Sequence, residues 1–323
     1  MFSIDNAAGL QFEFNHNGSL RHLRLNDVHI NLFVGNEVEG GPANLWLRLH
    51  DDNANVELAP LLGPRSPLAF GNNGAAGIWR DLRLRLALRL AAETPTWFWH
   101  LRVDNLGSAA RTIELLLVQD LGLAAYGAIR TNEYYVSHYI DLCPLQHRER
   151  GWVIAARQNQ AVDGCHPWAL IGSLRRGASY ATDALQVLGV AARAGVLPAG
   201  LTDGLPGARL QHEHALAAIE DEALMLAPGD GADLGFFGCV QAHHPEATSN
   251  ADLAAVDAAL ALPEALAPAW SDDEQAAVAP VRTLFSGAPL LTVTQFDARE
   301  LDTLFSASQR NEEHDDAGTL LSF

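Results

Sequence analysis

The sequence contains no lysine: all 21 basic residues are arginine, against 39 acidic residues, and the formal net charge is −18. A surface of this sign does not favour contact with a phosphate backbone or with anionic lipid, so we expect neither nucleic acid nor a membrane as partner. The apolar runs are strand-length and fall far short of the ~20 residues that cross a bilayer as a helix. The first residues also lack the basic segment of a secretory signal.

Cysteine is scarce as well. Cys143, Cys165 and Cys239 are odd in number, widely spaced and without a C-x-x-C pair, which indicates reduced thiols in a cytoplasmic protein. The chain has 323 residues, of which 48% are hydrophobic and 19% charged, and this composition excludes global disorder. The length suits one large all-β domain or two domains of ordinary size.

Short strands are predicted for the first 240 residues. Asn17-Gly18 lies between apolar runs and is a strong hairpin signal. Leu82 to Leu90 places leucine at the even positions, while arginine occupies most of the odd ones, the pattern of a half-buried strand. Thr96 to Val103 follows, Asp104 to Gly107 turns the chain, and Thr112 to Val118 runs back. Many short strands joined by turns indicate a mainly β protein, a sandwich rather than an α/β fold.

Later runs of the same kind predict further strands at 152–156, 168–174, 223–226 and 234–240. The composition then changes near residue 250, where 251–261 and 272–285 become rich in alanine and leucine. Ser249 or Asn250, and later Ser271, are suitable helix N-caps. We therefore divide the chain into a β domain, 1–248, and a helical appendix with the start of a following region, 249–323. Thr319 to Phe323 reads as the opening of another strand, so we expect the sequence to be part of a longer chain.

Polar and aromatic residues are densest from Gln119 to Asp141, which contains four of the five tyrosines. If Tyr134 to Asp141 is a strand, alternate residues from Tyr135 to Asp141 share one face. Its rings would cover the apolar C–H patches of a sugar, and its hydroxyl and carboxylate groups would satisfy the sugar hydroxyls. With neighbouring polar residues added, the candidate substrate-binding set is Arg130, Glu133, Tyr135, Ser137, Tyr139, Asp141, Gln158 and Trp168. The alternative is purely structural, because aromatic residues also suit pleated, half-buried surfaces.

Other chemistry has weaker signals. His212-Glu213-His214 and His243-His244 suggest a metal, but no third ligand has a recognisable spacing, and we expect neither metal nor cofactor. Asp120, Glu133 and Asp141 are carboxylates that could be paired, although sequence alone does not give the separation that a glycosidase needs. We assign no catalytic residue.

Five segments occur in a characteristic order: Gln119-Asp120-Leu121-Gly122, Asn132 to Asp141, Ala156 to Asn159, Pro167-Trp168 and Tyr180 to Asp183. Together they resemble the amino-terminal β-sandwich of glycoside hydrolase family ninety-four. The resemblance is most specific from about Val118 to Gln186 and is greatest to the 1,2-β-oligoglucan phosphorylases and cyclic β-1,2-glucan synthases.

The resemblance implies a galactose-mutarotase-like supersandwich. In that family a separate helical barrel carries the acid and the phosphate-binding residues of inverting phosphorolysis, so the resemblance implies that this chain has neither. The implied partners are a β-glucan oligosaccharide, the C-terminal catalytic barrel and a second copy in a homodimer.

Three functions remain open at this stage. The first is an ancillary carbohydrate-binding or assembly domain of a β-1,2-glucan phosphorylase or synthase that is non-catalytic alone. The second is a stand-alone aldose epimerase, which needs a histidine and a carboxylate that face one groove. The third is a purely structural dimerisation domain.

Overall fold

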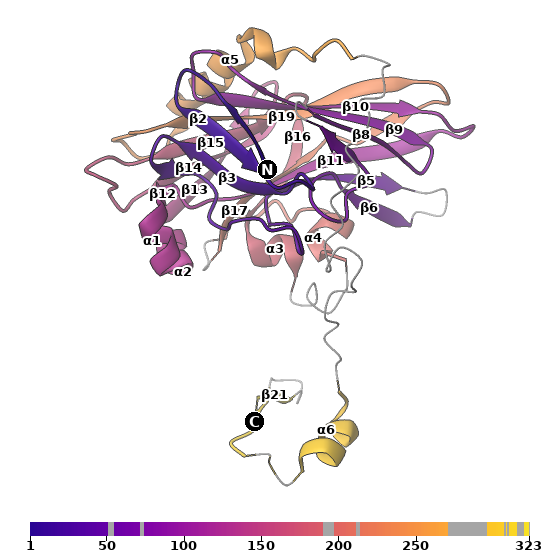
Figure 1. The fold of residues 1–323 in the computed structure, drawn as a ribbon, viewed down its shortest axis with the longest axis vertical. Helices are drawn as coiled ribbons and strands as arrows, with labels where there is room; N and C mark the ends of the chain where they lie inside the picture. Colours follow the sequence, from indigo (N-terminus) through magenta and orange to yellow (C-terminus); the bar gives the residue numbers. More distant parts are fainter. Residues whose placement is uncertain are drawn as a thin grey trace.

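The computed structural model describes residues 1–50, 55–71, 74–189, 197–210, 214–270, 296–306, 308, 310–314 and 320–322. The protein is mainly β and antiparallel, as the sequence predicts (Figure 1). Within the described residues a five-stranded sheet has the order β1–β2–β3–β4–β12 and lies beside a fourteen-stranded sheet. A separate pair, β20 and β21, includes part of the strand expected at 319–323; Thr319 and Phe323 lie outside the described residues.

The strands of the smaller sheet are β1 (Phe2–Asp5), β2 (Leu10–Phe14), β3 (Leu20–Leu25), β4 (Val28–His29) and β12 (Ala124–Ala125). The first seven strands of the larger sheet are β5 (Asn44–His50), β6 (Val56–Pro60), β7 (Ala69–Gly71), β8 (Gly74–Trp79), β9 (Leu82–Leu90), β10 (Thr96–Asn105) and β11 (Arg111–Asp120). Its other strands are β13 (Ile140–His147), β14 (Gly151–Gln158), β15 (Trp168–Ser173), β16 (Gly177–Asp183), β17 (Ala215–Asp221), β18 (Leu224–Leu226) and β19 (Gly231–Gln241). The last pair is β20 (Glu313–His314) and β21 (Leu320–Ser322).

Helices are short and lie outside the sheets. They are α1 (Tyr126–Thr131), α2 (Glu133–His138), α3 (Ala184–Leu188), α4 (Ala199–Thr202), η2 (Asn250–Leu253), α5 (Ala254–Leu260), η3 (Pro263–Ala265) and α6 (Ala298–Phe305). None of the helices in the described part of the chain combines the length and apolarity needed to span a bilayer.

Strand β9 shows how the sequence pattern sets the layers. Leu82, Leu84 and Leu86 are buried, whereas Arg83 is exposed on the other face. The leucines join one core with Leu101 of β10 and Leu115 of β11, which belong to different halves of the larger sheet. The sheet therefore folds over on itself and packs its two halves face to face, as in a sandwich.

The two halves meet at β14, which pairs with β13 and β15 and also touches β16 through Gly151 and Gly177. Gly151 has φ +64°, and a Cβ there would lie 2.2 Å from the carbonyl oxygen of Gly177. Glycine is therefore required where the two strands approach each other.

The turn at Asp104 to Gly107 does more than reverse the chain. Strand β10 pairs with β9 and β19, whereas β11 pairs with β5, β17 and β18. The two strands do not form a hairpin; the turn carries the chain from one half of the sandwich to the other. Sequence patterning cannot reveal this, because it fixes which face is buried but not which strand is the neighbour.

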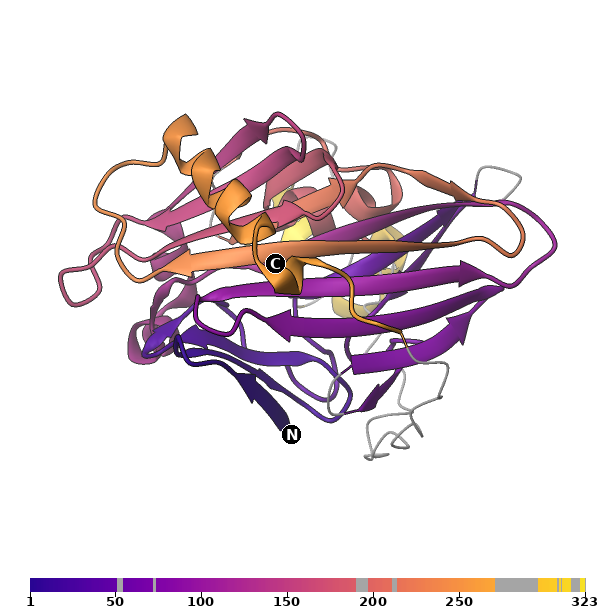
Figure 2. The same ribbon diagram turned by 90° about the horizontal axis from the view of Figure 1, so that it is seen from above.

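The segment after residue 248 starts as predicted. Ser249 caps η2 and forms a reciprocal capping box with Asp252. Helix α5 then buries Val256 and Ala259 against the outer face of the larger sheet, and Figure 2 shows it, in orange, lying over the strands. The second helix expected at 272–285, with its cap at Ser271, lies outside the described residues.

Candidate functional site

Tyr134 to Asp141 is not a strand, and the sequence-based prediction is wrong there. Helix α2 spans Glu133–His138, and strand β13 begins only at Ile140. The Asn132 side chain accepts a hydrogen bond from the backbone N–H of Tyr135 at 3.0 Å and so caps the helix. Asn132 followed by Glu133 is a helix-start signal that outweighs the strand preference of the tyrosines.

One side of α1 and α2 is apolar and faces the protein. Ile129 of α1 and Val136 of α2 pack with Leu32 and Ala124 in a small separate core. Ser137 of α2 is buried as well, and most other residues of the two helices are exposed. Figure 1 shows the two helices together at one corner of the sandwich.

Tyrosines dominate the solvent side. Tyr134, Tyr135 and Tyr139 are 46%, 48% and 39% exposed. The hydroxyl of Tyr139 donates to that of Tyr135 at 3.2 Å, and their rings lie 5.0 Å apart, centroid to centroid. This hydrogen bond raises the pKa of Tyr139 above its ordinary value. Tyr134 lies outside the set predicted from the sequence, and its ring contacts Phe33 at a centroid distance of 6.2 Å.

Charged pairs accompany the tyrosines. Asp141, at the start of β13, forms an ion pair with Arg209. Arg130 and Glu133 form a second, exposed pair at 3.7 Å between α1 and α2. We call Tyr134, Tyr135, Tyr139 and the Asp141–Arg209 pair the tyrosine surface. Arg209 was missed by the sequence analysis because it lies 68 residues from Asp141, and no local pattern links the two positions.

Three of the eight candidate residues are buried instead. Ser137 has no exposed surface, because in a helix it points away from Tyr135; its hydroxyl accepts the backbone N–H of Ala215. Gln158 donates to the carbonyl oxygens of Gly122 and Val136 at 3.1 and 3.2 Å. Trp168 donates its indole N–H to Thr248 at 3.1 Å. Ser137 and Gln158 support the α2 region from inside, whereas Trp168 belongs to the core that packs under α5, and none of the three lies on the tyrosine surface.

A buried carboxylate holds the two sheets together beneath this corner. Asp120, with no exposed surface, accepts backbone N–H groups of Leu32 at 2.9 Å and Phe33 at 2.7 Å. Burial raises the pKa of Asp120 to about 6. The Phe33 ring contacts His214 at 4.9 Å, and burial lowers the pKa of His214 to about 4. Asp120 is thus placed to fix the Phe33 loop and not to reach a ligand.

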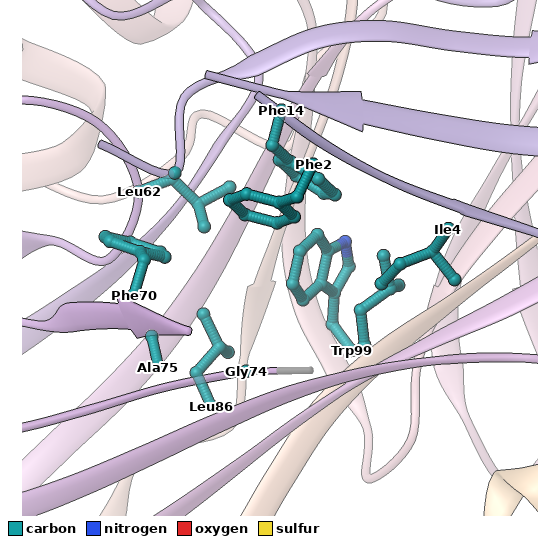
Figure 3. A pocket seen from close by; sticks show the side chains of 11 residues that line it. Phe2, Ile4, Phe14, Leu62, Phe70, Gly74, Ala75, Leu86 and Trp99 are labelled. Atoms are coloured by element: carbon teal, nitrogen blue, oxygen red, sulfur yellow. The ribbon is translucent and has the colours of Figure 1, made fainter. Parts of the chain in front are cut away.

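A separate apolar pocket lies between the smaller sheet and β8–β10 (Figure 3). Phe2, Phe14, Phe70 and Trp99 line it, together with aliphatic side chains. Its cavity volume of about 20 Å³ has room for roughly one water molecule. A sugar ring does not fit there, and no charged side chain is among the described residues that line the pocket.

The metal hypothesis gains no support from the described residues, among which no three histidine, cysteine or acidic side chains gather to bind an ion. His244 stacks on Trp168 at 5.1 Å and contacts Asp252 at 2.9 Å, which is a structural role. His212 and Glu213 lie outside the described residues.

Sequence similarity identifies this large β-sandwich as a carbohydrate-related domain. The chain belongs to the family described as SOGP N-terminal domain, whose sequence model matches residues 13–238. It is 30% identical over 242 residues to a 1,2-beta-oligoglucan phosphorylase from Listeria innocua serovar 6a, an alignment that covers 75% of this chain. The same alignment covers 21% of that enzyme, so the chain spans about a fifth of its length.

Solved structures match at lower similarity. A polysaccharide lyase has a TM-score of 0.46 at 11% identity, covering 73% of this chain and 32% of its own. A bacterial glucoamylase in complex with acarbose also has a TM-score of 0.46, at 7% identity, covering 77% of this chain and 32% of its own. Scores this low say nothing about function.

Proposed function

We propose that this chain is an ancillary carbohydrate-binding domain of a larger β-1,2-glucan phosphorylase or cyclic β-1,2-glucan synthase, with the catalytic acid elsewhere in the longer protein. The observation that carries the proposal is the tyrosine surface, and the similarity to a 1,2-beta-oligoglucan phosphorylase supports the choice of ligand. We also propose that the domain contacts the catalytic barrel, can assemble as a homodimer and acts in the cytoplasm. The three free cysteines support the last point.

The chemistry of the tyrosine surface suits a glucose residue. The exposed ring faces of Tyr135 and Tyr139 can cover the apolar C–H side of the sugar. Their hydroxyls already share one hydrogen bond and retain further acceptor capacity for sugar hydroxyls. Asp141 and Arg209 add an acceptor and a donor with charge, which strengthens hydrogen bonds to a neutral ligand. Because the surface is open to water, we expect weak binding.

Calorimetric titration of the purified chain with β-1,2-linked gluco-oligosaccharides tests the proposal, with cello-oligosaccharides as the linkage control. We expect saturable binding that prefers the β-1,2 linkage and that is lost in Tyr135→Ala and in Asp141→Ala. Tyr139→Phe keeps the ring and removes one hydroxyl, so it should weaken binding less than Tyr139→Ala. Absence of binding at millimolar ligand, or equal binding of both linkages, would contradict the proposal.

A structural assembly domain is the second candidate, and one observation favours it. Ser137, Gln158 and Trp168 belong to the segments that carry the family resemblance, yet all three are buried and hold the framework. If such motifs serve packing alone, the tyrosine surface would be an interface with the rest of the enzyme. Loss of phosphorolysis by the complete enzyme in Tyr135→Ala, without any sugar binding by this chain, would favour that function.

An aldose epimerase has less support. The histidine and the carboxylate of an epimerase must face one groove. Asp120 has no exposed surface and binds the backbone N–H of Phe33, whereas His214 contacts the ring of Phe33. The two side chains therefore do not share a groove. Acceleration of glucose mutarotation that disappears in His214→Ala would revive this candidate.

A further inference from the structure

A second polar and aromatic group lies on the smaller sheet, outside the tyrosine surface. Glu13 of β2 is paired with His22 of β3, and His29 of β4 is paired with Arg24, two residues beyond His22. Because alternate residues of a strand share a face, Glu13, His22 and His29 lie on the same side of the sheet. Tyr126, the first residue of α1, sits against both histidines.

The three rings form one cluster. The His22 and His29 rings are 5.1 Å apart, and Tyr126 lies 5.7 Å from His22 and 4.9 Å from His29, centroid to centroid. Tyr126 remains 43% exposed, so it offers ring surface to a ligand from solvent. The cluster is thus a second group of aromatic rings, at the start of α1, whereas the tyrosine surface lies on α2 after the end of α1.

The two histidines differ in how far solvent reaches them. His22 is partly exposed, although its Nδ1 is shielded from solvent and has no hydrogen-bond partner among the described residues, whereas His29 is buried at 9% exposure. Burial lowers the pKa of His29 to about 4, and the charge of Arg24 acts in the same direction. Burial also lowers the pKa of His22, and this effect outweighs the opposing charge of Glu13. Both imidazoles are therefore neutral near pH 7, and each presents one N–H donor and one nitrogen acceptor. Neutral donor–acceptor groups beside an aromatic ring suit a hydroxyl-rich, uncharged ligand.

We propose that His22 and Tyr126, with the buried His29 behind them, form a second subsite for the same glucan chain that the tyrosine surface holds, a proposal that rests on the function proposed above. Helix α1 connects the two places, because Tyr126 begins it and Tyr135 follows in α2. Nine residues separate these tyrosines, so their Cα atoms are at most roughly 30 Å apart, and less through two helices. An oligosaccharide long enough to reach both subsites gains affinity by effective concentration, whereas a short one does not.

Titration with β-1,2-linked gluco-oligosaccharides of increasing length tests this arrangement. For the unmodified chain we expect affinity to rise at least tenfold between the shortest and the longest ligand that binds. Tyr126→Ala should keep the affinity for short ligands and lose the gain with length, and His22→Gln should reduce that gain. Tyr135→Ala should weaken all lengths. Ile78→Ala, which changes an exposed apolar residue on β8, is the control that should change nothing. Circular dichroism checks that each variant is folded.

The two proposals fail in different ways. If the unmodified chain binds no oligosaccharide of any length, both the proposed function and the second subsite are wrong. If it binds, and Tyr126→Ala and His22→Gln keep the full gain with length, the second subsite is wrong while the proposed function stands.

Discussion

Two helical attachments cover this sandwich, and they differ in what they leave exposed. Helix α5 buries Val256 and Ala259 against the larger sheet and shows solvent Ala254, Asp257 and Ala258. The α1–α2 pair buries Ile129 and Val136 in the same manner but shows tyrosines. Docking a short helix requires only a small apolar side. The three exposed tyrosines on α2 and just after it are not needed to dock the helices. Their presence distinguishes α1–α2, a candidate binding surface, from α5, which only covers the sheet.

The largest effect should come from the buried motif residues. Trp168→Ala removes a fully buried indole, its hydrogen bond to Thr248 and its stacking on His244. We expect a loss of about 3–5 kcal/mol in the free energy of unfolding. Tyr135→Ala, on the exposed side of α2, should change it by no more than about 0.5 kcal/mol. Urea denaturation of both variants measures the difference; similar losses would contradict the separation of support from surface.

The pH dependence of stability should distinguish the contributions of Asp120 and His214, two titratable groups under the α1–α2 corner. The pKa of Asp120 is raised from 3.8 to about 6 in the folded protein, so its contribution is fully present below about pH 4 and is lost as pH rises through 6. The pKa of His214 is lowered from 6.5 to about 4, so its contribution is present above about pH 6.5 and is lost as pH falls through 4. The two effects oppose each other between pH 4 and 6.

Single substitutions reveal each contribution. In that window Asp120→Asn should make stability fall more steeply as pH decreases, and His214→Gln should make it fall less steeply, each by an amount of the order of 2 kcal/mol across the window. Thermal denaturation at several pH values measures both slopes. Identical slopes in the two variants and the unmodified chain would show that neither group changes its proton affinity on folding.

A smaller effect is expected at the cap of α2. Asn132→Ala removes the hydrogen bond to the Tyr135 N–H and should cost about 1 kcal/mol. Because the loss is local, hydrogen exchange should accelerate in α2 while α5, which follows η2 with its Ser249 capping box, stays protected. Asn132→Asp, which can also cap, should restore protection. Uniform acceleration in both helices would show that the cap has no local role.

The smallest effect belongs to the exposed ion pair. Arg130 and Glu133 are 3.7 Å apart in solvent, and such pairs contribute little to stability. Arg130→Ala should shift the urea midpoint within error. A clear destabilisation would mean that this pair orients α1 against α2.

Sequence reasoning identified the β architecture because alternation leaves a direct mark, as in Leu82 to Leu90. It also found the Ser249 cap, since capping chemistry is local. It failed at Tyr134 to Asp141, where tyrosines with strand preference follow Asn132, and the cap determined the structure. It could not find Arg209 opposite Asp141 or the transfer of β11 to the other half of the sandwich, because both depend on contacts distant in sequence.

Mapping backbone amide shifts on addition of a β-1,2-linked gluco-oligosaccharide tests the central claim most directly. The account predicts saturable shifts in 126–141 and at Arg209, with α5 unchanged. Shifts centred on α5, or none at millimolar ligand, would contradict the assignment of the α1–α2 corner as the carbohydrate-binding surface.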